Sequence, residues 1–446
     1  MSAIDQYINL YRENRAAVEA HSAPALNALR PAALAALEKA GRLPEKGDEG
    51  FEKTSVEKMF APDYGVNINR VNIPVDIAAA FRCDVPNLST LMGIIVNDRF
   101  VPTATLLKNL PEEITVCSFS EAASGPMAEV LARHLGTAAP MDKPGVALNT
   151  LLAQDGVLIH AARGARSDKP VQLVSIFNSP TPLLAPRRVL VVAEEGSAIS
   201  VLKCDHSQAG SSYLSSEVVE IIAGKNAEVN WYDLEESNPD TTRYSQLFAR
   251  QEADSRFQGV AATLTNGMTR NEFNLSLDGE NADCHLAGMA IGSGSQHIDN
   301  TSEVVHRSTR GRSEQLFKYS LDDSAQGAFE GGIEVCPGAR FTEAYQTNRN
   351  ILASDTARMH SKPQLLIYND DVKCSHGAAT GQLDQRAMFY MRQRGIPERE
   401  ARTMLMQAFM VDVIDSIRLE SLRDRLRHLV ECRFSGHPSG CADCQK

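Results

Sequence analysis

The sequence predicts a mainly β protein in which a long central β domain lies between two helical ends. Short apolar alternations separated by turn residues fill the chain from about Val146 to Leu366, a pattern typical of many short strands. A small unit of turn residues recurs in front of several of these strands. Residues 1–40 and the chain from residue 384 onward instead show apolar residues at helical spacing. We therefore divide the chain into four predicted parts, 1–140, 141–368, 369–434 and 435–446.

The first part, residues 1–140, is expected to be helical at its start and mixed afterwards. Ile4, Ile8 and Tyr11 form a helical stripe, and Gly41 ends a second segment that is rich in helix formers. A strand is expected at Leu91–Val96 and a helix at Pro126–Leu135. Prolines at positions 140 and 144 mark the boundary with the central part.

The central part, residues 141–368, is expected to consist of repeated strands of ordinary short length. The clearest of them are Val189–Ala193, Ile199–Leu202, Val218–Ile222 and Val229–Tyr232. The recurring unit is a turn followed by a small residue, as in GKNAEV from Gly224 and GENADC from Gly279. Such corners are typical of a coiled β-solenoid, but a β-sandwich or a jelly roll fits the same texture equally well.

The third part, residues 369–434, is expected to be a C-terminal helical domain. Asp384 can cap a helix that Gly395 ends, and Pro397 is well placed at the first turn of the next helix. Leu405, Phe409 and Val413 then follow at i, i+4 spacing. Core packing is the default explanation of such a stripe, although its width leaves room for a partner surface.

The composition excludes several classes of function. The chain has 446 residues, a net charge of −11 and a pI near 5.5, which argues against nucleic acid and against an anionic membrane surface. No apolar run is long enough to span a bilayer, and no secretory signal is visible. Nine scattered cysteines fit reduced thiols in the cytoplasm better than disulfides. No phosphate-binding loop is present, so ATP hydrolysis by this chain is not expected.

The most informative motif is NDDVKCSHGAATGQLD, residues Asn369–Asp384. Cys374 and His376 are two residues apart, so in an extended segment both side chains lie on the same face. A thiol and an imidazole are ligands suited to iron, copper or zinc. An arbitrary Cys-x-His pair is more often a packed cysteine beside a hydrogen-bonded histidine.

This motif resembles the signature of the SufB/SufD family, subunits of the Suf iron–sulfur cluster assembly complex, and in particular its SufD type. Four further blocks are similar to the family: ALNTLLAQDG from Ala147, SQHIDNTS from Ser295, QTNRNILASD from Gln346 and SKPQL from Ser361. Met391 stands where the SufB type carries a cysteine proposed to anchor the cluster, which is why the resemblance favours the SufD type. The resemblance implies a right-handed parallel β-helix for the central part.

The resemblance also implies a function. The chain would be a non-catalytic subunit in a complex with one SufB-type paralogue and two SufC-type ABC ATPases, and would aid iron acquisition and the formation of a transient iron–sulfur cluster shared with the paralogue. His376 and, less strongly, Cys374 would lie at the interface with the paralogue. The helical domain, including Leu405, Phe409 and Val413, would contact the ATPase. Family members have been linked to reduced flavin, but no stretch of this chain has the pattern of a flavin site.

Two further sets of residues could bind metal. His297, Asp299 and His306 are one, although a hydrogen-bonded polar ladder is the preferred explanation. The other is the tail, where Cys432, His437, Cys441 and Cys444 could form a zinc site. Two alternative functions therefore remain, a zinc-binding protein acting through its tail and a carbohydrate-active β-helix enzyme. The enzyme would need clustered carboxylates and aromatic subsites, and aromatic residues make up only 6% of this chain.

Overall fold

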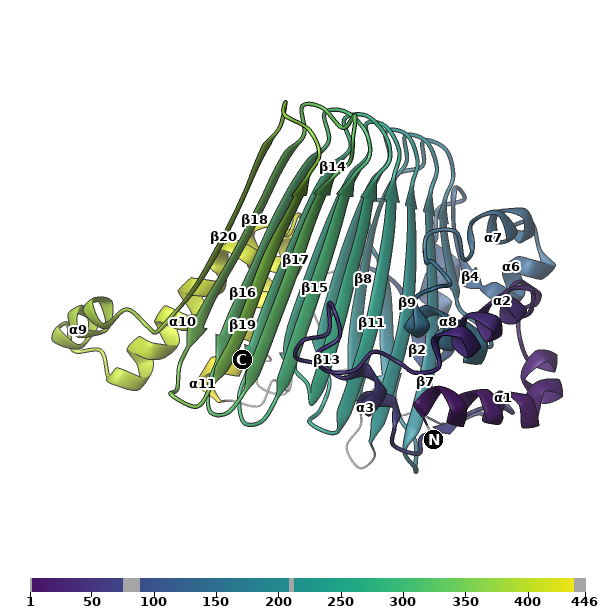
Figure 1. Cartoon of the computed structure of the whole chain (residues 1–446), viewed down its shortest axis with the longest axis horizontal. Helices are drawn as coiled ribbons and strands as arrows, with labels where there is room; N and C mark the ends of the chain where they lie inside the picture. The colour runs from purple at the N-terminus through teal and green to yellow at the C-terminus, as the bar shows by residue number, and fades with distance from the viewer. Residues whose placement is uncertain (1, 75–88, 208–211, 437–446) are drawn as a thin grey trace.

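The computed structural model describes residues 2–74, 89–207 and 212–436, which form three successive parts (Figure 1). Helices and short strands of the N-terminal part lie at one end of a long two-sheet solenoid, and the C-terminal helices follow its last strand, with α9 (Gln385–Gln393) beyond the other end. The predicted parallel β-helix is confirmed, and the alternatives of a β-sandwich and a jelly roll are wrong. Among strands β5 to β20, every recorded pairing of one with another is parallel and joins a strand to the next but one along the chain.

Each coil of the solenoid contributes one strand to each of two sheets. The first sheet contains, in spatial order, β19 (Arg358–Ile367), β17 (Gln326–Val335), β15 (His297–His306), β13 (Met268–Leu277), β11 (Thr241–Gln251), β9 (Tyr213–Ala223), β7 (Leu183–Ala193), β5 (Val157–Ala161) and β4 (Ile114–Ser118), with β1 (Gly65–Val66) beside β7. The second sheet contains β20 (Lys373–Gly381), β18 (Glu343–Leu352), β16 (Arg312–Leu321), β14 (Asp283–Gly292), β12 (Arg256–Thr265), β10 (Glu228–Glu236), β8 (Ala198–Ser207), β6 (Val171–Phe177), β2 (Leu91–Val96) and β3 (Arg99–Pro102).

The recurring turn unit forms the corners of the coils. Its asparagine adopts a left-handed conformation, with φ of 55° at Asn226 and 56° at Asn281, which asparagine tolerates better than most residues. The small residue that follows, Ala227 or Ala282, is buried inside the corner. At Gly279 a Cβ atom would lie 1.9 Å from the backbone nitrogen of Ala253, so no larger residue fits there. The glycine, asparagine and alanine of the recurring unit are thus the residues that the conformation and the close packing of each corner require.

The strands are longer than the sequence indicates, because charged residues continue them inside the solenoid. A cluster between the two sheets, which we call the interior charge network, contains three cations (Arg187, Lys203, Arg243) and four carboxylates (Asp205, Glu217, Asp233, Glu235). Its side chains are 7% exposed or less. Isolated buried charges would be expensive, so each network member is ion-paired across the sheets.

Distances in the interior charge network are those of direct ion pairs. Arg187 Nη1 lies 3.0 Å from Asp205 Oδ1, and Lys203 Nζ lies 2.7 Å from Glu217 Oε2. Arg243 donates to Asp233 and lies 3.9 Å from Glu235. Burial raises the pKa of Glu235 to about 7, although Arg243 and Thr269 oppose this shift. When Glu235 is protonated, three cations face three carboxylates, and the network is neutral.

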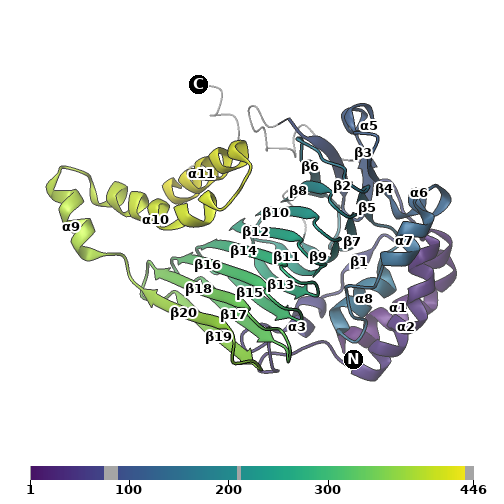
Figure 2. The ribbon, with the colours of Figure 1, turned by 90° about the horizontal axis from the view of Figure 1, so that it is seen from above.

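The N-terminal part covers one end of the first sheet (Figure 2). Its helices are α1 (Ala3–Ala20), α2 (Pro24–Ala40), α3 (Val56–Phe60), α5 (Ala104–Asn109), α6 (Phe119–Ser124), α7 (Ala128–His134) and α8 (Pro144–Leu152). Gly41 ends α2 with φ of 70°, as expected. Arg30 of α2 is buried and donates to the backbone carbonyls of Leu151 and Ala153, both at 2.7 Å, which joins α2 to the end of α8.

The C-terminal part consists of α9 (Gln385–Gln393), α10 (Glu398–Asp415) and α11 (Glu420–Ser435). Asp384 caps α9 through the backbone amides of Arg386 and Ala387. Helices α10 and α11 pack on the outer face of the second sheet, while α9 extends beyond the end of the solenoid (Figure 2). These helices begin only after β20, so residues 373–381, which fall inside the predicted helical part 369–434, form the last strand of the solenoid.

Candidate functional site

The solenoid ends in an open face at β19 and β20. Within the described residues β19 pairs only with β17, and β20 only with β18. Each of these strands therefore presents one edge of backbone N–H and C=O groups that no neighbouring strand satisfies. Exposed edges of this kind template the pairing of another chain unless they are covered. We call this end of the solenoid, with the side chains that β19 and β20 turn inward, the open end.

Cys374 and His376 lie on the same face of β20, as their spacing predicts. They are in register with Ala344 and Gln346 of β18, which are both buried in the solenoid. The two side chains therefore lie on the inward face of the second sheet, in line with buried residues of β18, but no further coil covers them. His376 is exposed. Cys374 is half-buried against the cluster around Val335, and burial raises the pKa of its thiol, so it is less reactive than a free cysteine.

The rest of the open end is partly apolar. Ile367 on β19 is in register with Val335, and it is 40% exposed although Val335 is fully buried. Leu366 and Tyr368 beside it are also exposed. A side chain that would be core in any earlier coil is thus left uncovered in the last one. An apolar exposed surface beside two free strand edges is typical of a protein interface.

The set His297, Asp299 and His306 is not brought together. His297 and His306 are the first and last residues of β15 and point to opposite sides of the sheet. His306 is buried, its Nε2 lies 2.9 Å from Ser313 Oγ, and burial lowers its pKa to about 4. In residues 2–74, 89–207 and 212–436 no group of three histidine, cysteine or acidic side chains could hold a metal ion.

His297 and Asp299 instead hold a segment of the N-terminal part. Residues 49–55, which we call the strap, run across the outer face of the first sheet. The hydroxyl of Thr54 lies 2.7 Å from His297 Nε2 and donates to Asp299 Oδ2 at 2.5 Å. Burial lowers the pKa of His297. Sequence reasoning missed this contact because nothing in the local pattern pairs residues 243 positions apart.

The predicted ATPase-contact residues differ widely in exposure. Val413 is fully buried between α10 and the second sheet and is not available to a partner. Phe409 is half-buried over Lys318, whose Nζ lies 4.9 Å from the ring centroid, and Leu405 is also half-buried. The exposed apolar side chains of this region are Phe389 and Tyr390 on α9, at 63% and 58%, and Met404 on α10. The stripe is therefore mainly core, which was the default explanation of its spacing.

The predicted tail site lies mostly outside the described residues. His437, Cys441 and Cys444 all fall in the range 437–446, which the structure does not describe. Cys432 belongs to α11, and its Sγ lies 3.4 Å from His428 Nε2. Zinc binding by the tail stays a prediction.

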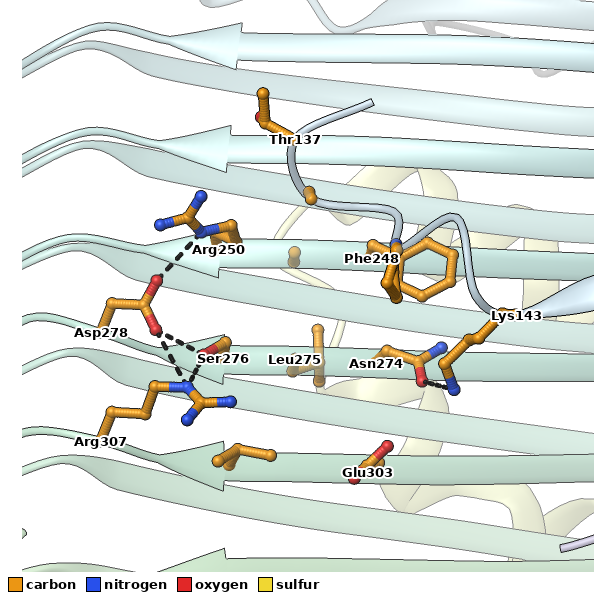
Figure 3. A pocket seen from close by; sticks show the side chains of 14 residues that line it. Thr137, Lys143, Phe248, Arg250, Asn274, Leu275, Ser276, Asp278, Glu303 and Arg307 are labelled. Atoms are coloured by element: carbon orange, nitrogen blue, oxygen red, sulfur yellow. Dashed lines mark hydrogen bonds and ion pairs between the residues drawn. The ribbon is translucent and has the colours of Figure 1, made fainter. Parts of the chain in front are cut away.

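A groove of about 560 Å³ lies between residues 137–143 and the outer faces of β11, β13 and β15 (Figure 3). Arg250 Nε donates to Asp278 at 3.0 Å, and Arg307 Nε lies 3.6 Å from the other carboxylate oxygen. Phe248 in its floor is only 3% exposed. Glycoside hydrolysis needs two carboxylates that work together, and of the two described carboxylates in this lining, Asp278 is already paired with arginine. The groove gives no support to a carbohydrate-active enzyme.

No helix among the described residues is long and apolar enough to cross a membrane. Two family models match the chain: "SUF system FeS cluster assembly, SufBD core domain" over residues 176–409, and "SufBD protein N-terminal region" over residues 1–173. An iron–sulfur cluster assembly SufBD family protein of Synechocystis is 29% identical over 88% of both chains. The iron–sulfur cluster assembly protein SufD of Escherichia coli is 28% identical over 65% of this chain and 69% of its own length, and SufD of Bacillus subtilis is 26% identical over 64% and 65%. The chain belongs to the SufBD family of the Suf system for iron–sulfur cluster assembly.

Proposed function

We propose that this SufBD-family subunit acts as the SufD-type partner of a SufB-type paralogue. The observation that carries the proposal is the open end, which has two free strand edges and inward side chains that no further coil covers. Pairing of β19 and β20 with the last strands of a paralogue would satisfy both edges at once. Cys374 and His376 would then lie at the junction of the two subunits.

The SufD type is favoured over the SufB type by Met391 and by the signature NDDVKCSH of residues 369–376. Methionine cannot supply a thiolate, so the thiolate that anchors a nascent cluster would come from the paralogue. His376 would hold or guide iron beside it, since an exposed imidazole at the junction can act as a metal ligand. The iron–sulfur cluster is the cargo of this assembly, with sulfide supplied by a separate desulfurase, and the chain itself has no catalytic role.

This proposal predicts that a charge at the open end prevents pairing. Replacing Ile367 with lysine places an ammonium group where the partner would bury an apolar side chain. Loss of a central interface contact costs about 2 kcal/mol or more, so we expect the affinity for the paralogue to fall by at least about 30-fold. The measurement is titration calorimetry with the purified SufB-type paralogue of the same organism. Leu107→Lys is the matched control, because Leu107 is 66% exposed on α5, far from the open end, and should change nothing. Equal affinity of both variants would disprove this mode of pairing.

The SufC-type ATPase would bind the C-terminal helices at their exposed tip, not along the stripe that contains Val413. Helix α9 lies away from the solenoid body (Figure 1), and it carries the large, exposed side chains of Phe389 and Tyr390. Exposed aromatic side chains are enriched among residues that dominate interface energies. Movement driven by ATP in that subunit would reach the open end through the short connection from β20 to α9.

Replacing Phe389 with aspartate should weaken ATPase binding without unfolding the chain. The side chain is 63% exposed, so its loss removes little packing, whereas a hot-spot contact is worth about 2 kcal/mol, or roughly 30-fold in affinity. Surface plasmon resonance with the immobilised ATPase measures the change. Val413→Ala is the informative contrast, since it should lower stability through a buried cavity and leave the affinity of the remaining folded protein unchanged. Full affinity of Phe389→Asp would place the ATPase elsewhere.

A further inference from the structure

The strap connects the N-terminal part to the middle of the first sheet. Arg270 on β13 donates from Nη2 to the carbonyl oxygen of Gly50 at 2.7 Å, and its guanidinium lies 4.0 Å from the centroid of the Phe51 ring. Arg270 is itself fixed by Asp299 at 2.7 Å, which also accepts from Thr54. Arg270 and Asp299 are buried, so the strap is anchored on a rigid base.

The strap also reaches β19, the last strand of the first sheet. Lys362 on β19 is hydrogen-bonded to Glu52 of the strap and to Glu330 of β17, the latter at 2.9 Å. Lys53 is exposed. Lys53 directly follows Glu52, the residue that is hydrogen-bonded to Lys362 on β19. Part of the N-terminal segment therefore stands over the outer edge of the open end.

A strand that paired with the free edge of β19 would lie about 4.8 Å beyond it. Its outward side chains would stand level with Lys362 and His360, because side chains of neighbouring strands align in columns. Glu52 lies above that column, where it is hydrogen-bonded to Lys362, and Lys53 directly follows it in the strap. The incoming strand would therefore bring its outward side chains against the strap.

We infer that the strap forms a polar rim of the contact between this chain and a second SufBD-family solenoid, with Lys53 and the Glu52–Lys362 pair touching the partner strand beside β19. This inference rests on the proposed pairing through the open end. It adds a contact from a segment some 300 residues away in the chain, since Glu52 and Lys362 are 310 positions apart. A polar rim around an apolar centre is the usual anatomy of a specific interface.

Site-specific photo-crosslinking in the full-length chain tests the rim. The crosslinking amino acid p-benzoylphenylalanine is placed singly at position 53 in the strap, position 378 on β20 and position 108 on α5, all of which are exposed in the isolated chain. Each variant is mixed with the SufB-type paralogue, irradiated and analysed by gel and mass spectrometry, after gel filtration has shown that it is folded. We expect crosslinks to the paralogue from positions 53 and 378 and none from position 108.

The three positions separate the two hypotheses. A crosslink from position 378 without one from position 53 would overturn the rim and leave the pairing in place. Absence of a crosslink from both would overturn the pairing, and the rim with it. A crosslink from position 53 that maps to the terminal strand of the paralogue supports the inference. A crosslink from 53 to any distant part of the paralogue contradicts it, as does an equal yield from position 108.

Discussion

Replacing His376 with alanine is expected to reduce cluster formation strongly while leaving the fold and the complex intact. The side chain is exposed on the last strand, so its loss should change the free energy of unfolding by no more than about 0.5 kcal/mol, as for most surface substitutions. Alanine has no nitrogen with which to hold iron, and loss of residues that support a metal site typically costs about 10- to 100-fold in function. Growth of cells that depend on this pathway, together with gel filtration of the mutant complex, measures both effects.

Two neighbouring substitutions sharpen this test. Ser375→Ala is the matched control, because Ser375 lies between Cys374 and His376 and points to the opposite face of β20. It should support normal growth. Cys374→Ala should have a milder effect than His376→Ala, since the paralogue is expected to supply the thiolate. Normal growth with His376→Ala would remove this residue from the mechanism, and loss of the complex would make its role structural.

Replacing Arg243 with methionine is expected to destabilise the chain by about 3–5 kcal/mol, the usual effect of removing one partner from a buried ion pair. Arg243 is paired with Asp233 and lies within 4 Å of Asp205, Glu217 and Glu235. Without it, two cations would remain for four buried carboxylates. Burial opposes the ionisation of Asp205, yet Arg187, Lys203 and Arg243 hold its pKa well below its usual value, so part of that support would also be lost.

Urea denaturation followed by circular dichroism measures this loss at neutral pH. Arg133→Met is the control, because Arg133 also pairs with a glutamate, Glu129, but both side chains are largely exposed on α7. An exposed pair of this kind contributes about 0.2–1 kcal/mol. If Arg243→Met and Arg133→Met had equal effects, the interior charge network would not stabilise the fold.

The features that could be predicted from the sequence are those that depend on local chemistry. The corner units at Asn226 and Asn281, the end of α2 at Gly41 and the cap of α9 at Asp384 each depend on a few adjacent residues. Cys374 and His376 share a face because strand geometry alone dictates it. Periodicity could not choose between a solenoid and a sandwich, since both bury alternate residues of short strands.

The features that could not be predicted depend on contacts between distant segments. In the sequence, Lys203 and Asp205 resemble the polar end of a strand. They can be buried between the two sheets only because Arg187 and Glu217, from other strands, form ion pairs with them. A hydrogen-bonded role was the preferred explanation for His297 and Asp299, but their partner Thr54 could not be predicted, because it lies in a segment with little periodicity. Val413 shares a stripe with Phe409, yet the second sheet covers one and leaves the other half-exposed.

The position of the strap sets an order of events during synthesis. Coils of a solenoid contact mainly their neighbours, so they can add one after another as the chain leaves the ribosome. The strap emerges early, but the strands that hold it, β13, β15 and β19, are synthesised more than 200 residues later. The strap cannot dock before those coils have folded. Once it docks, it connects an early segment of the chain to one of the last strands of the solenoid. Docking of the strap can therefore be completed only after β19 has formed, when β20 and the C-terminal helices are all that remains to be added to the described fold.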